Sequence, residues 1–152
     1  MDKTALQELG QFCGTVDYHR FTNSMVLTDG VKHLIENADC YWLLNSIASY
    51  QGMLKKDAAL QDIQFWTLRP YPKEGKPELK SVGKLWSNMK ASNEERPAAY
   101  ITCERDTGDV AIIQEVEVTD FPFDVLSEVK IWLEPTMMGG RLTMVALLSS
   151  EH

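Results

Sequence analysis

The apolar positions after residue 30 repeat with the period of an α-helix. Four of them fall at i, i+3, i+4 and i+7 on one face: Val31, Leu34, Ile35 and Ala38. Thr28 or Asp29 stands just before this stripe and is the expected N-cap. A second stripe with helical spacing follows: Trp42, Leu43, Ile47, Tyr50 and Leu54. Two adjoining helices with apolar faces must share a core, so the pattern predicts a packed helix pair.

Strand-like segments begin beyond the helices. Residues 64–68 are rich in aromatic and β-branched side chains and stop before Pro70. Residues 98–104 and 110–119 flank residues 105–109, a turn that contains the Asp and Gly residues preferred by short hairpin loops. The sequence therefore predicts one strand followed by an antiparallel hairpin.

A second pair of strands is predicted near the C-terminal end. Residues 129–133 and 142–148 are apolar and flank residues 137–140, which contain two consecutive glycines. Together the segments predict an α+β fold in which two or three helices pack on a four- to five-stranded antiparallel sheet. The length of 152 residues fits one domain spanning residues 1–152.

Residues 69–97 form a charged excursion between the predicted strands. This stretch is rich in Pro, Lys and Glu and carries 7 basic and 4 acidic residues. Four apolar residues within it keep helical spacing and predict one amphipathic helix: Leu79, Val82, Trp86 and Met89. Lysines recur every four residues on an adjacent face, at Lys76, Lys80 and Lys84. Because glutamates are interleaved with them, a solvated face is favoured over a phosphate-binding stripe.

The acidic excess is confined to the C-terminal third. Residues 1–96 carry 12 Lys and Arg against 12 Asp and Glu, and residues 97–152 carry 3 against 10, which gives the net charge of −7. In the second hairpin arm Val110, Ile112 and Val116 share one face, so the glutamates of that arm are expected on the other, solvent-facing side. Five carboxylates define the predicted acidic surface: Glu104, Asp106, Asp109, Glu115 and Glu117. Such a surface suits a basic protein partner, and direct nucleic-acid binding is disfavoured because a net negative chain repels a polyanion.

The composition also indicates the cellular compartment of the protein. Three cysteines, Cys13, Cys40 and Cys103, leave at least one thiol unpaired, which favours the reducing cytoplasm over a secreted disulfide framework. The longest apolar stretches, 41–44 and 145–148, are far shorter than the roughly 20 residues of a membrane helix. The start of the chain carries charges and no apolar segment, so neither a signal peptide nor membrane association is expected.

Few chemistries are supported by residue spacing. His19, His33, Cys13 and Cys40 lack the spacing of a metal site, and no glycine-rich phosphate loop is present, so no metal or cofactor is expected. A Cys–His nucleophile pair stays formally open because such partners meet in space rather than in sequence. The absence of catalytic spacing favours a protein that is not an enzyme.

A ligand pocket between the helix pair and the sheet is the alternative site. Asp29, Tyr41, Gln51 and Asp120 would supply polar groups within an aromatic lining. A structural role competes with this hypothesis, because Asp29 suits an N-cap and Asp120, close to a proline, suits the start of a turn. The four tryptophans have the same two interpretations, since they suit a core or a stacking platform.

Several short strings occur together in order along the chain. They are Thr28-Asp29-Gly30-Val31, Tyr41-Trp42-Leu43, Phe65-Trp66 with Leu68, and Thr119-Asp120-Phe121-Pro122. In this order they resemble a family of small bacterial and phage-associated proteins classed as a domain of unknown function. The resemblance spans about residues 12–152 and departs at residues 69–97 and at the last four residues, where Ser-Ser-Glu-His replaces a Pro-Ser-Glu-aromatic ending. It implies a phage or mobile-element setting, and it transfers no activity or catalytic residue.

These observations leave two functional hypotheses. The leading one is a non-enzymatic interaction protein of a phage or mobile element that binds a host or defence-complex protein through the acidic surface. The alternative is a small-ligand-binding protein or small enzyme that uses the pocket between the helices and the sheet. A homodimer is a further expectation, because the exposed edges of a sheet must be covered and pairing of two sheets is one common solution.

Overall fold

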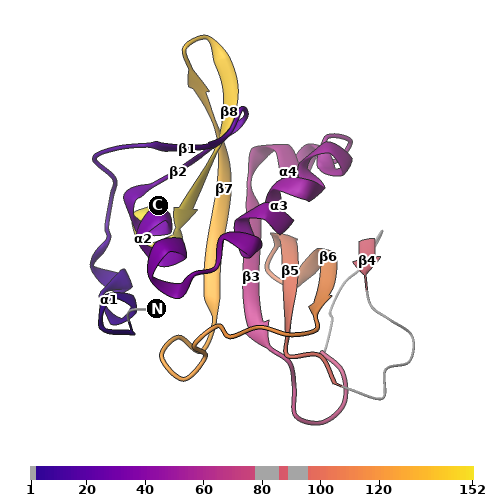
Figure 1. The fold of residues 1–152 in the computed structure, drawn as a ribbon. Helices are drawn as coiled ribbons and strands as arrows, with labels where there is room; N and C mark the ends of the chain where they lie inside the picture. The colour runs from indigo at the N-terminus through magenta and orange to yellow at the C-terminus, as the bar shows by residue number, and fades with distance from the viewer. Residues whose placement is uncertain (1–2, 78–85, 89–95) are drawn as a thin grey trace.

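The computed structural model describes residues 3–77, 86–88 and 96–152. In chain order the helical elements are α1 (Lys3–Gln7), the 3-10 turn η1 (Leu9–Gln11), α2 (Asp29–Ala38), α3 (Tyr41–Leu54), α4 (Ala58–Asp62) and the 3-10 turn η2 (Ser149–Glu151). The strands are β1 (His19–Thr22), β2 (Met25–Leu27), β3 (Gln64–Pro70), β4 (Trp86–Asn88), β5 (Ala99–Asp106), β6 (Asp109–Val116), β7 (Val129–Met138) and β8 (Arg141–Leu148). Helices α2, α3 and α4 gather on one side of a single sheet (Figure 1). The predicted α+β class is confirmed.

The sheet is larger than predicted and is mixed. Its strand order is β1-β2-β8-β7-β3-β5-β6-β4, with β2 parallel to β8 and β4 parallel to β6. The expected four- to five-stranded antiparallel sheet was therefore wrong, since the described residues form eight strands. Strands β1, β2 and β4 have four, three and three residues, too few for a recognisable alternation of side chains.

The helix count was also too low. The described residues form four α-helices, whereas two or three were expected. Helices α2 and α3 are the predicted pair. Helices α1 and α4 have five residues each, which is little more than one turn and too short to show an apolar stripe.

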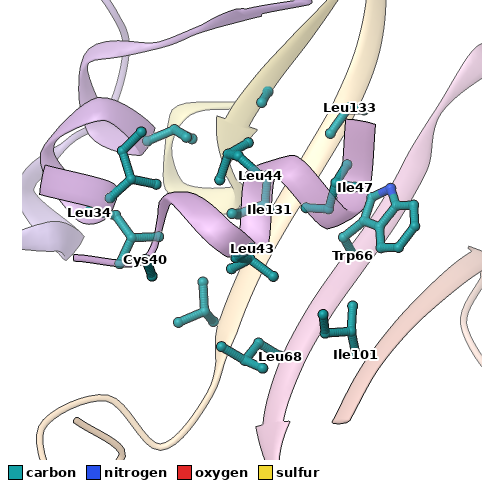
Figure 2. Packing of buried hydrophobic residues seen from close by; sticks show 14 of the residues in the cluster. Leu34, Cys40, Leu43, Leu44, Ile47, Trp66, Leu68, Ile101, Ile131 and Leu133 are labelled. Carbon is teal, nitrogen blue, oxygen red and sulfur yellow. The ribbon is translucent and has the colours of Figure 1, made fainter. Parts of the chain in front are cut away.

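The core lies between the helices and one face of the sheet. Leu34, Leu43, Leu44 and Ile47 project from the helices toward the strands, and all are at most 2% exposed (Figure 2). Four strand residues meet them from the sheet: Leu68, Ile101, Ile131 and Leu133. The indole of Trp66 belongs to the same layer and is 1% exposed, so this tryptophan is a core residue.

The predicted hairpin is confirmed as β5 and β6. Its turn places Gly108 at φ 83°, a backbone conformation that favours glycine. A register shift between Cys103 and Glu104 pairs Glu104 with Val110 and leaves Ile112 opposite Cys103. Val110 therefore lies on the opposite face of the sheet from Ile112. The prediction that these two residues share a face was wrong, because a β-bulge inserts one residue between them.

The second predicted hairpin is longer than expected. Strand β7 runs to Met138 and β8 starts at Arg141, so Gly139 and Gly140 alone form the turn, with φ 56° and φ 76°. Two consecutive positive φ values define the tight turn that suits the twist of paired strands. The paired arms extend past the rest of the sheet (Figure 1).

The charged excursion is described in part. Residues 86–88 form β4, whose Trp86 pairs with Ile112 of β6, so the helix predicted over residues 79–89 was wrong at this point. Backbone pairing with a distant strand cannot be foreseen from local spacing. The rest of that predicted helix lies outside the described residues.

Candidate functional site

The face of the sheet opposite the helices carries a groove, here named the open-face groove. Along β3, Trp66 and Leu68 point into the core, whereas Phe65, Thr67 and Arg69 point to the other side. The groove has a volume of about 640 Å³ and crosses β7, β3, β5 and β6. Its lining comprises Phe65, Thr67, Arg69, Tyr100, Glu104, Thr107, Gly108, Val110, Lys130 and Trp132. Aromatic and charged side chains on an otherwise small-residue floor make this groove a candidate binding surface.

Three of the five predicted carboxylates lie at the β5–β6 turn, and one of them, Glu104, lines this groove. Glu104 lines the groove and accepts a hydrogen bond from the Gly108 N–H at 3.1 Å. Asp106 is exposed and accepts from the Thr107 N–H at 2.7 Å. Asp109 accepts from Arg105 at 3.1 Å. We refer to Glu104, Asp106 and Asp109 as the hairpin carboxylates.

Arg105 ties the hairpin to the helical layer. Its Nε donates to Asp57 at 2.7 Å, and its side chain is 16% exposed. Burial tends to raise the pKa of the Asp57 carboxyl, but hydrogen bonds from Arg105 and from the Leu60 N–H outweigh it, so the pKa is lowered. The same hydrogen bond raises the pKa of Arg105. The turn that carries the hairpin carboxylates is therefore held in place.

The other two predicted carboxylates lie at the far end of β6. Glu115 accepts a hydrogen bond from the Tyr71 hydroxyl at 2.8 Å, and Glu117 follows the end of the strand. Burial and then this carboxylate raise the pKa of Tyr71. Because Asp109 and Glu115 are six residues apart on one strand, they are separated by about 20 Å. The structure thus divides the predicted acidic surface into two groups.

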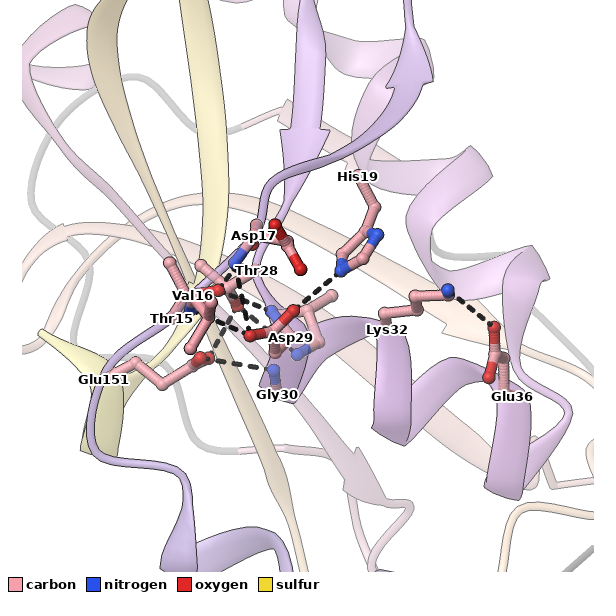
Figure 3. A network of polar contacts seen from close by, with 11 residues as sticks. Thr15, Val16, Asp17, His19, Thr28, Asp29, Gly30, Lys32, Glu36 and Glu151 are labelled. Atoms are coloured by element: carbon pink, nitrogen blue, oxygen red, sulfur yellow. Dashed lines mark hydrogen bonds and ion pairs between the residues drawn. The ribbon is translucent and has the colours of Figure 1, made fainter.

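Asp29 begins α2 and sits in a dense polar network (Figure 3). Its carboxylate contacts His19 Nε2 at 2.7 Å and accepts from the backbone N–H groups of Val16 and Asp17 at 2.9 and 3.4 Å. The bond to His19 and then that to Val16 lower the pKa of Asp29 to about 2. The helix cap itself is Thr28, whose hydroxyl accepts from the Val31 N–H at 3.4 Å. Asp29 therefore fastens the preceding loop to the helix.

Glu151 completes this network from the other end of the chain. It accepts from the Thr28 hydroxyl at 2.6 Å, the Gly30 N–H at 3.2 Å and the Leu148 N–H at 3.0 Å (Figure 3). The Nε2 atom of its neighbour His152 lies 2.5 Å from Glu134 Oε1. The last two residues are thus both anchored.

The remaining predicted pocket residues lie apart from Asp29 in the fold. Tyr41 starts α3 and is 45% exposed. Gln51, near the end of α3, exchanges two side-chain hydrogen bonds with buried Gln64 at 2.8 and 2.9 Å. Asp120 is exposed in the β6–β7 loop, where the Thr119 hydroxyl, rather than Asp120, accepts from the Phe121 N–H at 3.1 Å. None of these side chains lines the open-face groove.

The comparison with known families adds one finding. The family model described as "Family of unknown function (DUF6876)" matches residues 3–152, which is nearly the whole chain. The chain belongs to the DUF6876 family. The resemblance to a domain of unknown function is thereby confirmed at the level of the family. No curated protein and no solved structure matches this DUF6876 chain.

The cysteines of this DUF6876 protein are free thiols. Cys13 is exposed, and Cys40 and Cys103 are buried. Burial, with a smaller contribution from Asp39, raises the pKa of Cys40 to about 12, and burial likewise raises that of Cys103. The two buried thiols therefore behave as small hydrophobic residues. Among the described residues no group of three or more His, Cys, Asp or Glu side chains could hold a metal ion.

In the part of the chain that the structure describes, no helix has the length and apolarity needed to cross a bilayer.

Apart from Glu104, the sequence analysis did not assign the groove residues to a common site, and it missed the role of Glu151. The groove brings together Phe65 from β3 and Lys130 and Trp132 from β7. No local spacing in the sequence connects the residues of these two strands. A signal for Glu151 comes only from the resemblance described in the sequence analysis, which implies a Glu at this place in a Pro-Ser-Glu-aromatic ending. Its partner Gly30 is equally visible in the Thr-Asp-Gly-Val string, but only the fold brings the two together.

Proposed function

We propose that this DUF6876 protein is a non-enzymatic binding module that contacts a protein partner through the hairpin carboxylates. The observation that carries this proposal is the concentration of acid at the β5–β6 turn. Three carboxylates lie in or beside this turn, Asp57 approaches it from the helical layer, and Arg105 pairs with Asp57 and Asp109. Since one arginine offsets one of these four charges, the turn carries a negative surplus, and one of its carboxylates, Glu104, lines a groove with aromatic walls.

The chemistry of the partner follows from this charge. A basic protein surface, such as the nucleic-acid-binding groove of a host or defence-complex protein, would be complementary to fixed carboxylates beside aromatic side chains. The resemblance noted above supports a phage or mobile-element setting, and the free cysteines support the cytoplasm. Glu115 and Glu117 belong to the proposal as a second, separate contact.

A charge-matched pair of variants tests the proposal. The hairpin variant combines Glu104→Gln, Asp106→Lys and Asp109→Asn, which keeps hydrogen-bond acceptors at the two supported positions. The control combines Glu8→Lys with Glu36→Lys on the helical side and changes the net charge by the same amount. Tagged proteins are used to capture partners from bacterial cells, with nuclease treatment, and bound proteins are quantified by mass spectrometry.

The expected result is one stoichiometric protein that survives nuclease, is captured by the wild type and the control, and is lost from the hairpin variant. Equal capture by the hairpin variant would contradict the proposal. A third variant, Glu115→Gln with Glu117→Lys, measures how much the two carboxylates at the far end of β6 contribute to partner binding. Light scattering on the purified protein separates a hetero-partner from the alternative of self-association through the β1 edge.

A further inference from the structure

The open-face groove is hollow because rows of large side chains on the sheet lie on both sides of a row with small ones. Thr67 pairs with Thr102 of β5 and with Lys130 of β7, so small side chains occupy the middle of this row. The next row on one side is Trp132, Phe65 and Glu104, and the next row on the other side includes Arg69 and Tyr100. Large side chains on both sides of two threonines leave a trough that crosses the strands.

Two cations beside this trough share one carboxylate. Arg69 Nε donates to Glu128 Oε2 at 3.0 Å, and Lys130 Nζ lies 3.6 Å from Glu128 Oε1. Both cations line the groove, with side chains 32% and 49% exposed. In the described part of the chain neither has another polar partner, so donor groups of both remain for a second anion.

The aromatic wall next to these cations is preorganised. The rings of Phe65 and Trp132 meet edge to face, with centroids 5.0 Å apart and planes at 89°. Trp132 also contacts the His152 ring, with centroids 5.0 Å apart. An indole held by contacts with two rings offers a defined surface for a flat ligand at little entropic cost.

Glu104 does not cancel the positive charge at Lys130. It lies two strands and one row away, which corresponds to about 12 Å between the backbone positions. That separation exceeds the screening length of about 8 Å at physiological ionic strength. At the Lys130 and Arg69 end the two cations and the one carboxylate of Glu128 leave a net positive charge, and the hairpin rim carries negative charge.

We infer that the open-face groove binds a small planar aromatic ligand that carries an anionic group, a carboxylate or a phosphate. The ring packs against Phe65 and Trp132 above Thr67, and the anion bridges Lys130 and Arg69. The volume of about 640 Å³ is in the range of small-molecule sites. This site adjoins the proposed protein contact, with which it shares Glu104. The two proposals are tested separately, because the ligand site is tested on the isolated protein.

Titration followed by nuclear magnetic resonance tests which ligand charge this site prefers and whether the ligand binds beside Trp132. The indole N–H signal of Trp132, assigned with Trp132→Phe, is followed while phenyl phosphate, benzyl alcohol or benzylammonium is added. We expect a saturable shift with phenyl phosphate, and a Kd about fivefold weaker or worse for the neutral and cationic probes. A benzylammonium Kd equal to or lower than that of phenyl phosphate, or no saturable shift with phenyl phosphate, would overturn the inference.

Two substitutions move the affinity in opposite directions. Lys130→Ala removes one cation and should raise the Kd of phenyl phosphate about fivefold, whereas Glu128→Gln frees both cations and should lower it. The control Lys32→Ala removes a lysine on α2 that also faces one carboxylate, Glu36 at 3.8 Å, and should leave the Kd unchanged. The dispersion of each spectrum reports folding. An unchanged Kd in both groove variants would contradict the proposed anion site.

Discussion

The carboxylate of Glu151 accepts a hydrogen bond of 2.6 Å from the hydroxyl of Thr28, across 123 positions of the chain. Thr28 caps the N-terminus of α2, and the same carboxylate also accepts the Gly30 N–H of the first helical turn. A negative charge at this place is favourable, because the free N–H groups and the helix dipole are positive there. The end of the chain thereby completes the cap of its second helix.

Removal of this carboxylate should weaken the fold. Glu151→Ala deletes three hydrogen bonds to a charged acceptor and leaves the Thr28 hydroxyl without this partner, so we expect a loss of about 2 kcal/mol in the free energy of unfolding. Urea denaturation followed by circular dichroism measures the change. Ser150→Ala, an exposed neighbour, is the control and should be neutral. Equal stability of Glu151→Ala and the control would contradict the capping role.

A side chain at Gly30 should conflict with the same carboxylate. A Cβ placed there would lie 2.5 Å from Glu151 Oε1 and 2.8 Å from Leu148 Cδ1, so Gly30→Ala is expected to destabilise by about 1–3 kcal/mol. In combination with Glu151→Ala part of this cost should vanish, because one of the two obstacles is gone. Strictly additive effects in the double-mutant cycle would show that the two residues are not coupled.

Acid should release the loop that Asp29 holds. The pKa of Asp29 falls from 3.8 to about 2 on folding, chiefly through His19 and the Val16 N–H, so the ionised carboxylate stabilises the folded state. This contribution is complete above about pH 4 and disappears as the pH falls through about 2. Melting temperatures measured from pH 5 to pH 2 should fall more steeply for the wild type than for Asp29→Asn. Parallel curves would contradict the prediction.

Gln51 should prove structural. Its amide pairs twice with that of Gln64, which is fully buried and also accepts from Trp66 Nε1 at 2.8 Å. Gln51→Ala removes both of these hydrogen bonds from buried Gln64, which keeps its bonds to Trp66 Nε1 and the Leu60 carbonyl, and should cost about 1–3 kcal/mol in the free energy of unfolding. Asn45→Ala, on the exposed side of the same helix, is the matched control. An unchanged stability of Gln51→Ala would instead restore Gln51 as a candidate ligand contact.

The candidate sites could be predicted where their residues lie close together in the sequence, and could not be predicted where they come from distant segments. Glu104, Asp106 and Asp109 could be found from sequence, because they are close together at a turn that local residue preferences define. Asp29 could be singled out, but its partners Val16, in a loop, and His19, at the start of the four-residue strand β1, lie in segments without a periodic pattern. The groove could not be found at all, because Lys130, Thr67 and Tyr100 meet through the pairing of three strands.

The sequence by itself determined the elements whose signal lies within a few neighbouring residues. Helices α2 and α3 follow from apolar positions three and four residues apart, and the β5–β6 turn follows from Asp and Gly at adjacent positions. Only the tertiary structure decided the parallel pairing of β2 with β8, the contact of Glu151 with Thr28 and the open-face groove. Local periodicity reflects steric preferences and burial along one segment, whereas these features depend on which distant segments share hydrogen bonds, and that choice is made by the packing of the whole chain.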